Sequence, residues 1–266
     1  MNVMNTLLRD ELSKEVGGFF NVQYAALGGY PRETKQKWIQ FALVNSNHWI
    51  LLAYGFNDLD FITIYDPKNP TGENTEIPTS VLSSACQILK TSKTSISIGY
   101  MPCQRKPDKF NCGLFAFANA ITLASGGNPA AEQCQYDVSQ MRGHLNRCFL
   151  DNKIIPFPLL KYLVSRPITR GKPPDPSLFI PKTYDVFCNC RCLVERFSDP
   201  RNPDAINLVE CQDDDCPHTW FHPKCMEISE EVMKTIETVQ WYCLNCQKNN
   251  QKSPVSSPLD SDSSSP

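Results

Sequence analysis

Cysteine and histidine residues near the C-terminal end of the chain stand in close pairs, a spacing typical of metal ligands. Eight of the thirteen cysteines lie between positions 188 and 246, together with His222. Thiolate and imidazole donors in groups of four favour tetrahedral zinc. Four pairs supply eight donors and therefore predict two zinc ions, bound by Cys188, Cys190, Cys211, Cys216, His222, Cys225, Cys243 and Cys246.

A second group of residues could perform nucleophilic catalysis. A cysteine attacks a carbonyl when a histidine takes its proton, a carboxylate orients that histidine, and a donor stabilises the oxyanion. His48 opens a predicted strand, Asp66 closes the next strand at a turn, and Gln104 offers an amide donor. Cys112 stands where a predicted helix begins, and a helix N-terminus favours the thiolate form. Considered alone, Cys112 is better interpreted as a buried packing residue.

The elements that must position these residues follow from hydrophobic patterning and from turn residues. The run at 114–124 is continuously apolar and is followed by two glycines, which predicts a buried helix. The predicted strands and helices follow one another irregularly, which is typical of an α+β domain. We expect strands at 37–44, 49–54, 61–65 and 95–100, and helices at 5–16, 78–91, 114–124 and 137–150.

Composition divides the chain into four segments. Residues 1–165 form the predicted globular domain, and residues 183–248 form the zinc-binding domain. Residues 166–182 are rich in proline and basic side chains, which predicts a semi-extended linker. Residues 249–266 are rich in serine and proline, which predicts a disordered tail.

Charge and hydropathy argue against several classes of protein. The formal net charge of −2 argues against direct nucleic-acid binding and against a membrane-surface protein. No apolar run reaches the roughly 18 residues of a membrane span. Charged residues interrupt the N-terminal segment, so we expect no secretory signal. Clustered cysteines without such a signal indicate metal binding in a reducing compartment, the nucleus or the cytosol.

Four motifs of the first domain carry a family resemblance: His48-Trp49, Tyr65-Asp66, Gln104 and the sequence Cys-Gly-Leu-Phe at 112–115. They resemble the ubiquitin-like-protein proteases of the SUMO-protease type, which have a papain-like α+β fold. The segment 136–158 resembles the versions found in transposon-derived animal proteins, which often carry a PHD finger. Asn111 replaces the aspartate that usually precedes the cysteine of this family.

The resemblance implies a role for each matching residue. Cys112 would be the nucleophile, His48 the general base, and Asp66 the residue that orients this base. Gln104 would donate to the oxyanion beside the Cys112 amide. Trp49 would cover a narrow channel that admits a Gly-Gly tail. The match covers roughly residues 35–160.

The order of the zinc ligands also resembles that of a known family. Histidine stands fifth among the eight ligands, as in PHD fingers, whereas RING fingers usually have it fourth. The resemblance implies a cross-brace, in which the first and third pairs hold one zinc ion and the second and fourth pairs hold the other. Cys192 could replace Cys188 by its spacing from Cys190, but an aromatic residue before the first ligand, Phe187, favours Cys188.

The segment 211–222 resembles the PHD fingers of the inhibitor-of-growth subgroup, which read a methylated lysine of the histone H3 tail. Trp220 and Phe187 match two positions of the aromatic cage around the methyl-lysine cation. Leu208 falls where that subgroup has a methionine, and Gln212 replaces its usual aspartate. The resemblance implies that the finger recognises a protein, with the H3 tail as a candidate partner. A purely structural or docking module is the alternative.

The two resemblances together imply a cysteine protease or isopeptidase with an attached PHD finger. It would cleave after glycine, and its partner would be a ubiquitin-like modifier or a conjugate of one. The alternatives are a non-catalytic chromatin reader with a degenerate protease domain and a transposon-derived accessory protein whose finger contacts other proteins. The intact set of His48, Asp66 and Cys112 favours the enzyme, whereas Asn111 favours the reader.

Overall fold

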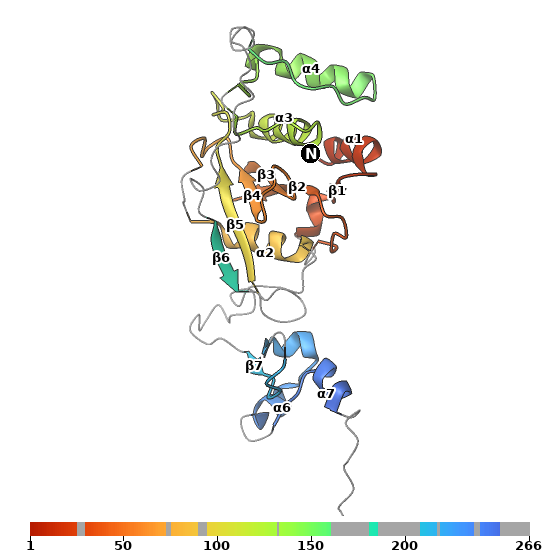
Figure 1. Cartoon of the computed structure of the whole chain (residues 1–266), viewed down its shortest axis with the longest axis vertical. Coiled ribbons are helices and arrows are strands. Elements are labelled where there is room, and N and C mark those ends of the chain that lie inside the picture. Colours follow the sequence, from red (N-terminus) through yellow and green to blue (C-terminus); the bar gives the residue numbers. More distant parts are fainter. Residues whose placement is uncertain are drawn as a thin grey trace, which may run out of the picture. The chain divides into compact units, whose positions relative to one another are not determined.

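The computed structural model describes residues 1–25, 30–72, 76–89, 95–131, 133–160, 181–185, 208–216, 219–236 and 240–250. The chain divides into two compact units. Among the described residues, the first unit ends at Asp185 and the second begins at Leu208. Each unit is described separately below, and Figure 1 shows the elements of both.

Six strands form one mixed sheet in the first unit, and their order in the sheet is their order in the chain. The pairs β1–β2 and β4–β5 are parallel, and the other three pairs are antiparallel. The strands are β1 (Gly17–Gly18), β2 (Trp38–Val44), β3 (His48–Tyr54), β4 (Ile62–Tyr65), β5 (Ser95–Met101) and β6 (Lys182–Asp185).

In the described part of this unit four α-helices accompany the sheet, and every predicted strand and helix of the first domain is present. The helix predicted at 5–16 begins earlier than expected, at Asn2. It also ends earlier, at Leu12, because the chain must leave it before entering β1 at Gly17. The helix predicted from 114 begins at Cys112. The helices are α1 (Asn2–Leu12), α2 (Thr79–Ile88), α3 (Cys112–Ala124) and α4 (Val138–Leu150).

Different helices cover the two faces of the sheet (Figure 1). In β3, Leu51 and Ala53 belong to a core that includes residues of α1, α3 and α4. Ile50 and Leu52 alternate with them and belong to a second core with α2. Because both faces are covered, the central strands are apolar at nearly every position, and α3 is buried along almost its whole length. The α+β class predicted from the sequence is confirmed.

The sixth strand corrects the predicted domain boundary. Residues 166–182 were expected to form a linker and the finger to begin at 183, but β6 pairs with β5 from Ser95↔Asp185 to Ile98↔Lys182. The segment contains Lys182 and Asp185 and has no apolar run, so only the exposed edge of β5 makes it a strand. The linker residues before 181 and the tail after 250 lie outside the described residues.

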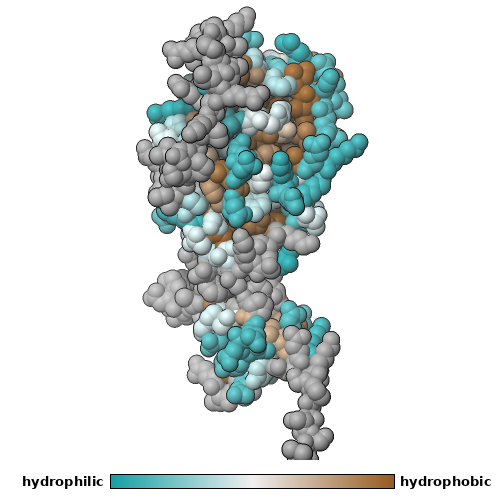
Figure 2. All heavy atoms as spheres, in the orientation of Figure 1, coloured by the Kyte–Doolittle hydropathy of each residue, from teal (hydrophilic) through white to brown (hydrophobic). Residues whose placement is uncertain are grey.

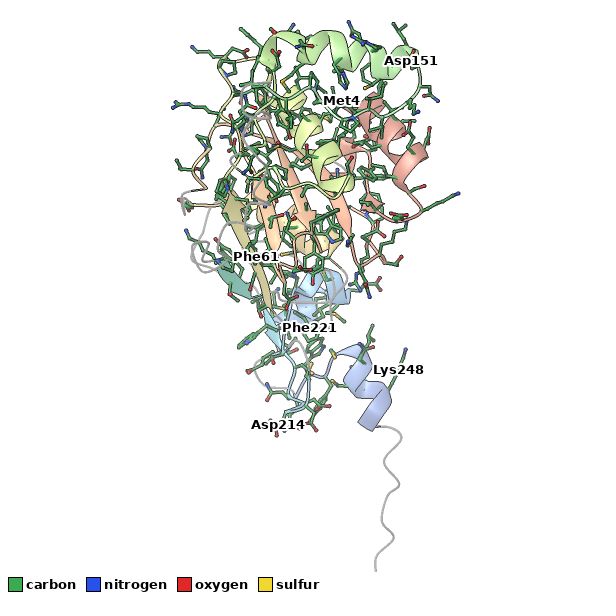
Figure 3. The ribbon with its side chains drawn as sticks, turned by 45° about the horizontal axis from the view of Figure 1, so that its top comes forward. Met4, Phe61, Asp151, Asp214, Phe221 and Lys248 are labelled. Atoms are coloured by element: carbon green, nitrogen blue, oxygen red, sulfur yellow. The ribbon has the colours of Figure 1, made fainter. Side chains whose placement is uncertain are left out.

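The second unit is small and contains short elements. Its core consists of Phe221 and four cysteines, with Trp241 packed against it. In Figure 3 Phe221 lies among the other side chains of this unit, whereas Asp214 lies on an outer loop and is exposed. The elements are β7 (Val209–Glu210), antiparallel to β8 (Trp220–Phe221), a 3-10 helix η4 (Pro223–Met226), α6 (Glu230–Met233) and α7 (Leu244–Asn250).

The outer surface of the first unit carries many hydrophilic side chains. Figure 2 shows them distributed between smaller apolar areas on the face in view. None of the helices in the described part of the chain has the length and apolar character that crossing a membrane requires.

Candidate functional site

The hairpin between β2 and β3 places His48 at the first position of β3. Asn45 and Ser46 both have positive φ values, 49° and 59°, which turn the chain tightly. The register then pairs Val44 with His48. Only 4% of His48 is exposed, so its imidazole ring is held in a fixed environment at the end of the strand.

Asp66 follows the last residue of β4 and faces the His48 ring. Its Oδ1 lies 2.6 Å from His48 Nε2 and also accepts the backbone N–H of Lys68 at 2.7 Å. Because an ionised carboxylate is only an acceptor, the Nε2 of neutral His48 must carry the hydrogen. The other ring nitrogen, Nδ1, is then unprotonated. It is buried and has no hydrogen-bond partner among the residues that the structure describes.

Cys112 is the first residue of α3 and is 4% exposed. The next residue, Gly113, lies against the ring of Trp49: a Cβ atom at this position would be 3.4 Å from Trp49 Cδ1 and 3.1 Å from Met1 Cε. Gly113 and Trp49 immediately follow Cys112 and His48 in the sequence. Their contact therefore brings the N-terminus of α3 to the beginning of β3, where a cysteine and a histidine could act together.

Gln104 makes two hydrogen bonds that no sequence pattern predicts. Its Nε2 donates to the carbonyl oxygen of Tyr136 at 3.1 Å, and its Oε1 accepts the backbone N–H of the same residue. Tyr136 is itself buried and donates from its hydroxyl to Asn119 Oδ1 at 3.0 Å. Gln104 therefore ties the segment around Tyr136 to the end of β5. One amide hydrogen is left, so the predicted oxyanion contact stays a prediction.

Asp108 and Arg142 both contact Asn111 and were not among the predicted site residues. Asp108 could have been recognised, because aspartate often accepts backbone N–H groups two and three residues later in a turn. Its Oδ1 accepts those of Phe110 and Asn111. Arg142 gives no such local signal, because 31 residues separate it from Asn111.

Three other thiols of this unit lie in environments that favour the protonated form. Burial is the main cause that raises the pKa of Cys103, Cys134 and Cys148. The charge of Asp66 raises the pKa of Cys103 further. These three cysteines are therefore poor nucleophiles at neutral pH, because the thiolate is the reactive form.

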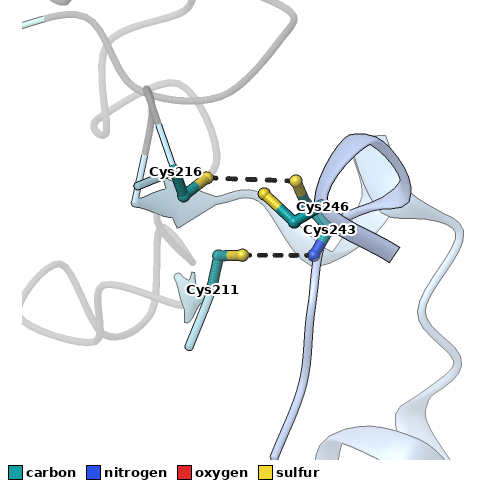
Figure 4. Close-up of side chains that lie close together, drawn as sticks. All are labelled: Cys211, Cys216, Cys243 and Cys246. Carbon is teal, nitrogen blue, oxygen red and sulfur yellow. Dashed lines mark hydrogen bonds between the residues drawn. The ribbon is translucent and has the colours of Figure 1, made fainter. Parts of the chain in front are cut away.

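Four cysteines of the second unit form a compact cluster (Figure 4). All four Sγ atoms lie within 4.8 Å of one another, and all four residues are buried. A tetrahedral zinc ion with Zn–S bonds of about 2.3 Å separates sulfur atoms by about 3.8 Å, and Cys216 Sγ lies 3.9 Å from Cys243 Sγ. A disulfide would need about 2.05 Å. The cluster therefore fits a metal ion; its members are Cys211, Cys216, Cys243 and Cys246.

These four residues are the second and fourth pairs of the predicted cross-brace. The backbone N–H of Cys243 donates to Cys211 Sγ at 3.3 Å, an outer contact that stabilises a metal-bound thiolate. Of the third pair, Cys225 lies on η4 and His222 directly precedes it; the N–H of Cys225 donates to the carbonyl of His222 at 3.0 Å. The first pair lies outside the described residues, so the second metal site stays a prediction.

The predicted peptide-binding residues lie along the two short strands. Trp220 on β8 is 37% exposed and pairs with Glu210 on β7. Leu208 is half-buried and directly precedes β7. An exposed indole beside a carboxylate could hold a cation. Phe187, the second predicted cage residue, lies outside the described residues.

Comparisons with known proteins find likenesses for parts of the chain. No family model matches it. Over 75 residues the chain is 35% identical to zinc finger protein DPF3 of Danio rerio. This matched stretch covers 28% of the chain and 17% of DPF3. The chain thus spans less than a fifth of the length of this curated relative.

Among solved structures, the chain is similar to the SUMO protease Ulp1 with its catalytic cysteine oxidised to a sulfenic acid. The TM-score is 0.38 and the sequence identity is 11%, and the match covers 57% of this chain and 75% of the Ulp1 chain. The Ulp1 protease domain in complex with Smt3 has a TM-score of 0.39 and 13% identity, covering 57% and 74%. At these values the likenesses say nothing about activity. The likeness to a zinc finger protein agrees with the zinc-binding domain predicted from the sequence.

Proposed function

We propose that this protein is a cysteine protease or isopeptidase that cleaves after glycine in a ubiquitin-like modifier or its conjugate. The observation that carries the proposal is the buried His48–Asp66 pair at 2.6 Å, whose free nitrogen Nδ1 is available beside the helix that begins at Cys112. A buried, oriented histidine without a partner for its basic nitrogen is suited to accept a thiol proton.

The proposed reaction uses these three residues in two steps. His48 Nδ1 takes the Cys112 proton while Sγ attacks the carbonyl carbon of the glycine, and Asp66 stabilises the resulting imidazolium. The amide bond breaks, its nitrogen takes the proton from Nδ1, and a thioester remains on Cys112. Water then gives a proton to Nδ1 and attacks the thioester. The glycine carboxylate leaves, and the thiol regains its proton.

The oxyanion would be stabilised by backbone and amide donors. The N–H of Cys112 lies at the first position of a helix, where backbone N–H groups have no partner within the helix. The remaining amide hydrogen of Gln104 is the second candidate donor. Removal of one such donor typically costs about 10²–10³ in rate.

The preference for glycine would come from the contact between Trp49 and Gly113. The space above Gly113 is already limited by the Trp49 ring and by Met1, at 3.4 and 3.1 Å from an added Cβ. A substrate chain that passes here has little room for side chains. Glycine residues lack a Cβ and fit such a channel.

For the second unit we propose a PHD finger with two zinc ions that binds a protein segment. Zinc would be held by the four clustered thiols and by His222 and Cys225 together with Cys188 and Cys190. It supplies folding energy that so small a core cannot provide. The exposed Trp220 beside Glu210 supports recognition of a cationic side chain, for which a methylated lysine of the histone H3 tail is the candidate. Such a partner favours the nucleus as location.

Electrophilic probes test the proposed activity. Ubiquitin and SUMO proteins whose terminal glycine carries a vinyl sulfone should label the full-length, zinc-loaded protein at one residue. The adduct should map to Cys112 and be lost in Cys112→Ser, while Cys148→Ser, a matched buried cysteine, should be labelled as the wild type is. If neither probe labels the protein while the His48–Asp66 pair is intact, the non-catalytic reader becomes the better account.

A further inference from the structure

Asn111, the residue immediately before Cys112, is held on both sides of its side chain. Its Oδ1 accepts from Arg142 Nε at 3.2 Å and from Arg142 Nη2 at 2.8 Å. Its Nδ2 donates to Asp108 Oδ2. Asn111 stands at the N-cap position of α3, yet its side chain does not cap the helix. Its orientation therefore follows from Arg142 and Asp108.

An amide is the side chain that satisfies both neighbours. Arg142 only donates hydrogen bonds, and an ionised Asp108 only accepts them. The backbone N–H of Phe110, followed by the N–H groups of Asn111, lowers the pKa of Asp108, so this carboxylate is ionised at neutral pH. An aspartate at position 111 would bring a second carboxylate against Asp108, whereas alanine would leave both neighbours without this partner.

Hydrogen bonds, rather than packing, hold this segment. Phe110 is 83% exposed, and an open hollow of 320 Å³ adjoins Asn111 and Arg142. Asp108 Oδ1 accepts the N–H groups of Phe110 at 2.7 Å and of Asn111 at 2.9 Å. Arg142 then connects the segment to a different element, α4. Loss of this connection should leave residues 108–111 free to move without disturbing the core.

The connection reaches the candidate nucleophile through the backbone. The carbonyl of Asn111 accepts the N–H of Phe115 at 3.0 Å and so belongs to the first turn of α3, which contains Cys112. On the other side, Arg142 extends from a well-anchored helix: Met141 is fully buried, and the Asp137 side chain caps α4 by accepting the N–H of Ser139 at 3.1 Å.

We infer that Arg142 is a positioning residue for Cys112: through Asn111 it fixes the first turn of α3 and with it the direction of the thiol. Arg142 does not touch the reacting atoms. The inference rests on the proposed function, because direction matters only if Cys112 reacts. Charge-assisted hydrogen bonds of this kind contribute about tenfold to an equilibrium or a rate, so the expected effect is measurable.

The test is a double-mutant cycle in the full-length, zinc-loaded protein. The readout is the rate at which a glycine-ended vinyl sulfone probe labels Cys112. Of the ubiquitin and SUMO probes, the one that labels the wild type faster is used. Arg142→Ala and Asn111→Ala should each slow labelling by about five- to tenfold, and the double variant no further, because each side chain acts through the other. Arg147→Ala, an exposed arginine on the same helix, should have no effect.

A charge exchange separates positioning from general loss of structure. Asn111→Asp should slow labelling, because two carboxylates then face each other. Adding Asp108→Asn should restore at least half of the wild-type rate, because the donor and the acceptor have only changed places. Losses that multiply in the double variant, or an exchange that does not recover, would overturn the inference. If the probe does not label the wild type, both the inference and the proposed function are wrong. If the probe labels the wild type and Arg142→Ala does not change the labelling rate, only the inference is wrong.

Discussion

Asp66→Asn keeps the size of the side chain and removes its charge. In the structure Asp66 Oδ1 accepts both His48 Nε2 at 2.6 Å and the backbone N–H of Lys68 at 2.7 Å. An asparagine must place its oxygen at this point, since its NH₂ group would face two donors. His48 should therefore keep its orientation and its unprotonated Nδ1. What is lost is the negative charge beside the imidazolium that forms when Nδ1 takes the Cys112 proton.

The size of the effect follows from this single hydrogen bond. A hydrogen bond to a charged group contributes about 1.5–3 kcal/mol, compared with about 1 kcal/mol between neutral groups. The difference of about 0.5–2 kcal/mol corresponds to a factor of roughly 2–30 in rate. Because only 5% of the His48 side chain and 14% of the Asp66 side chain are exposed, solvent screening is weak. We therefore expect a decrease of about tenfold or slightly more.

The assay is the release of aminomethylcoumarin from a modifier that ends in Gly-Gly, measured as kcat/KM beside the melting temperature. The control is Asp10→Asn, which removes an exposed charge on α1. An unchanged kcat/KM in folded Asp66→Asn would show that Asp66 does not act through His48. A loss above about a thousandfold, with the melting temperature retained, would instead mean that the amide has turned over and fixed the wrong tautomer.

Three further substitutions test the cysteine cluster, the channel at Gly113 and the aromatic cage one at a time. Cys211→Ser should lower the zinc content measured by elemental analysis from two ions to one and expose the second unit to proteases, while the first unit keeps its melting transition; an unchanged zinc content would contradict the cluster. Gly113→Ala should change the free energy of unfolding by less than about 1 kcal/mol, because the gain in helix propensity offsets the contact with Met1, but should lower cleavage of Gly-Gly substrates about tenfold; equal cleavage would refute the narrow channel. Trp220→Ala should weaken binding of trimethyl-lysine H3 peptide about tenfold by titration calorimetry, and a wild type that does not distinguish methylated from unmethylated peptide would remove the cage.

The main elements were predictable because their signals are local. In β3 and α3, apolar runs end at turn residues, and these runs alone define the elements that carry His48 and Cys112. The strand β6 was missed because it has no apolar pattern and exists only where β5 offers an edge. The grouping of Cys211 with Cys243 followed from the resemblance to PHD fingers, whose cross-brace places the second and fourth ligand pairs around one metal ion, and the four thiols do lie together.

The hydrogen bonds that hold Gln104 and Asn111 in place at the candidate site were not predictable, because they join residues far apart in the chain. Gln104 and Tyr136 are separated by 32 residues, and Asn111 and Arg142 by 31. In sequence Gln104 was only an amide at a suitable distance from Cys112; its two hydrogen bonds to Tyr136 depend on how the segment after α3 returns to the end of β5. Likewise, the sequence shows Asn111 only as a departure from a family pattern, and the hydrogen bonds of its amide to Asp108 and Arg142 are visible only in the structure.

Alkylation of the native protein tests most directly whether His48 activates Cys112. Iodoacetamide at neutral pH, followed by peptide mass spectrometry, should modify Cys112 before Cys103 and Cys134, whose pKa values are raised by burial, and His48→Ala should slow this step at least tenfold. If Cys112 reacts no faster than those two thiols, and His48→Ala changes nothing, then the histidine does not activate the cysteine and the first unit is a scaffold.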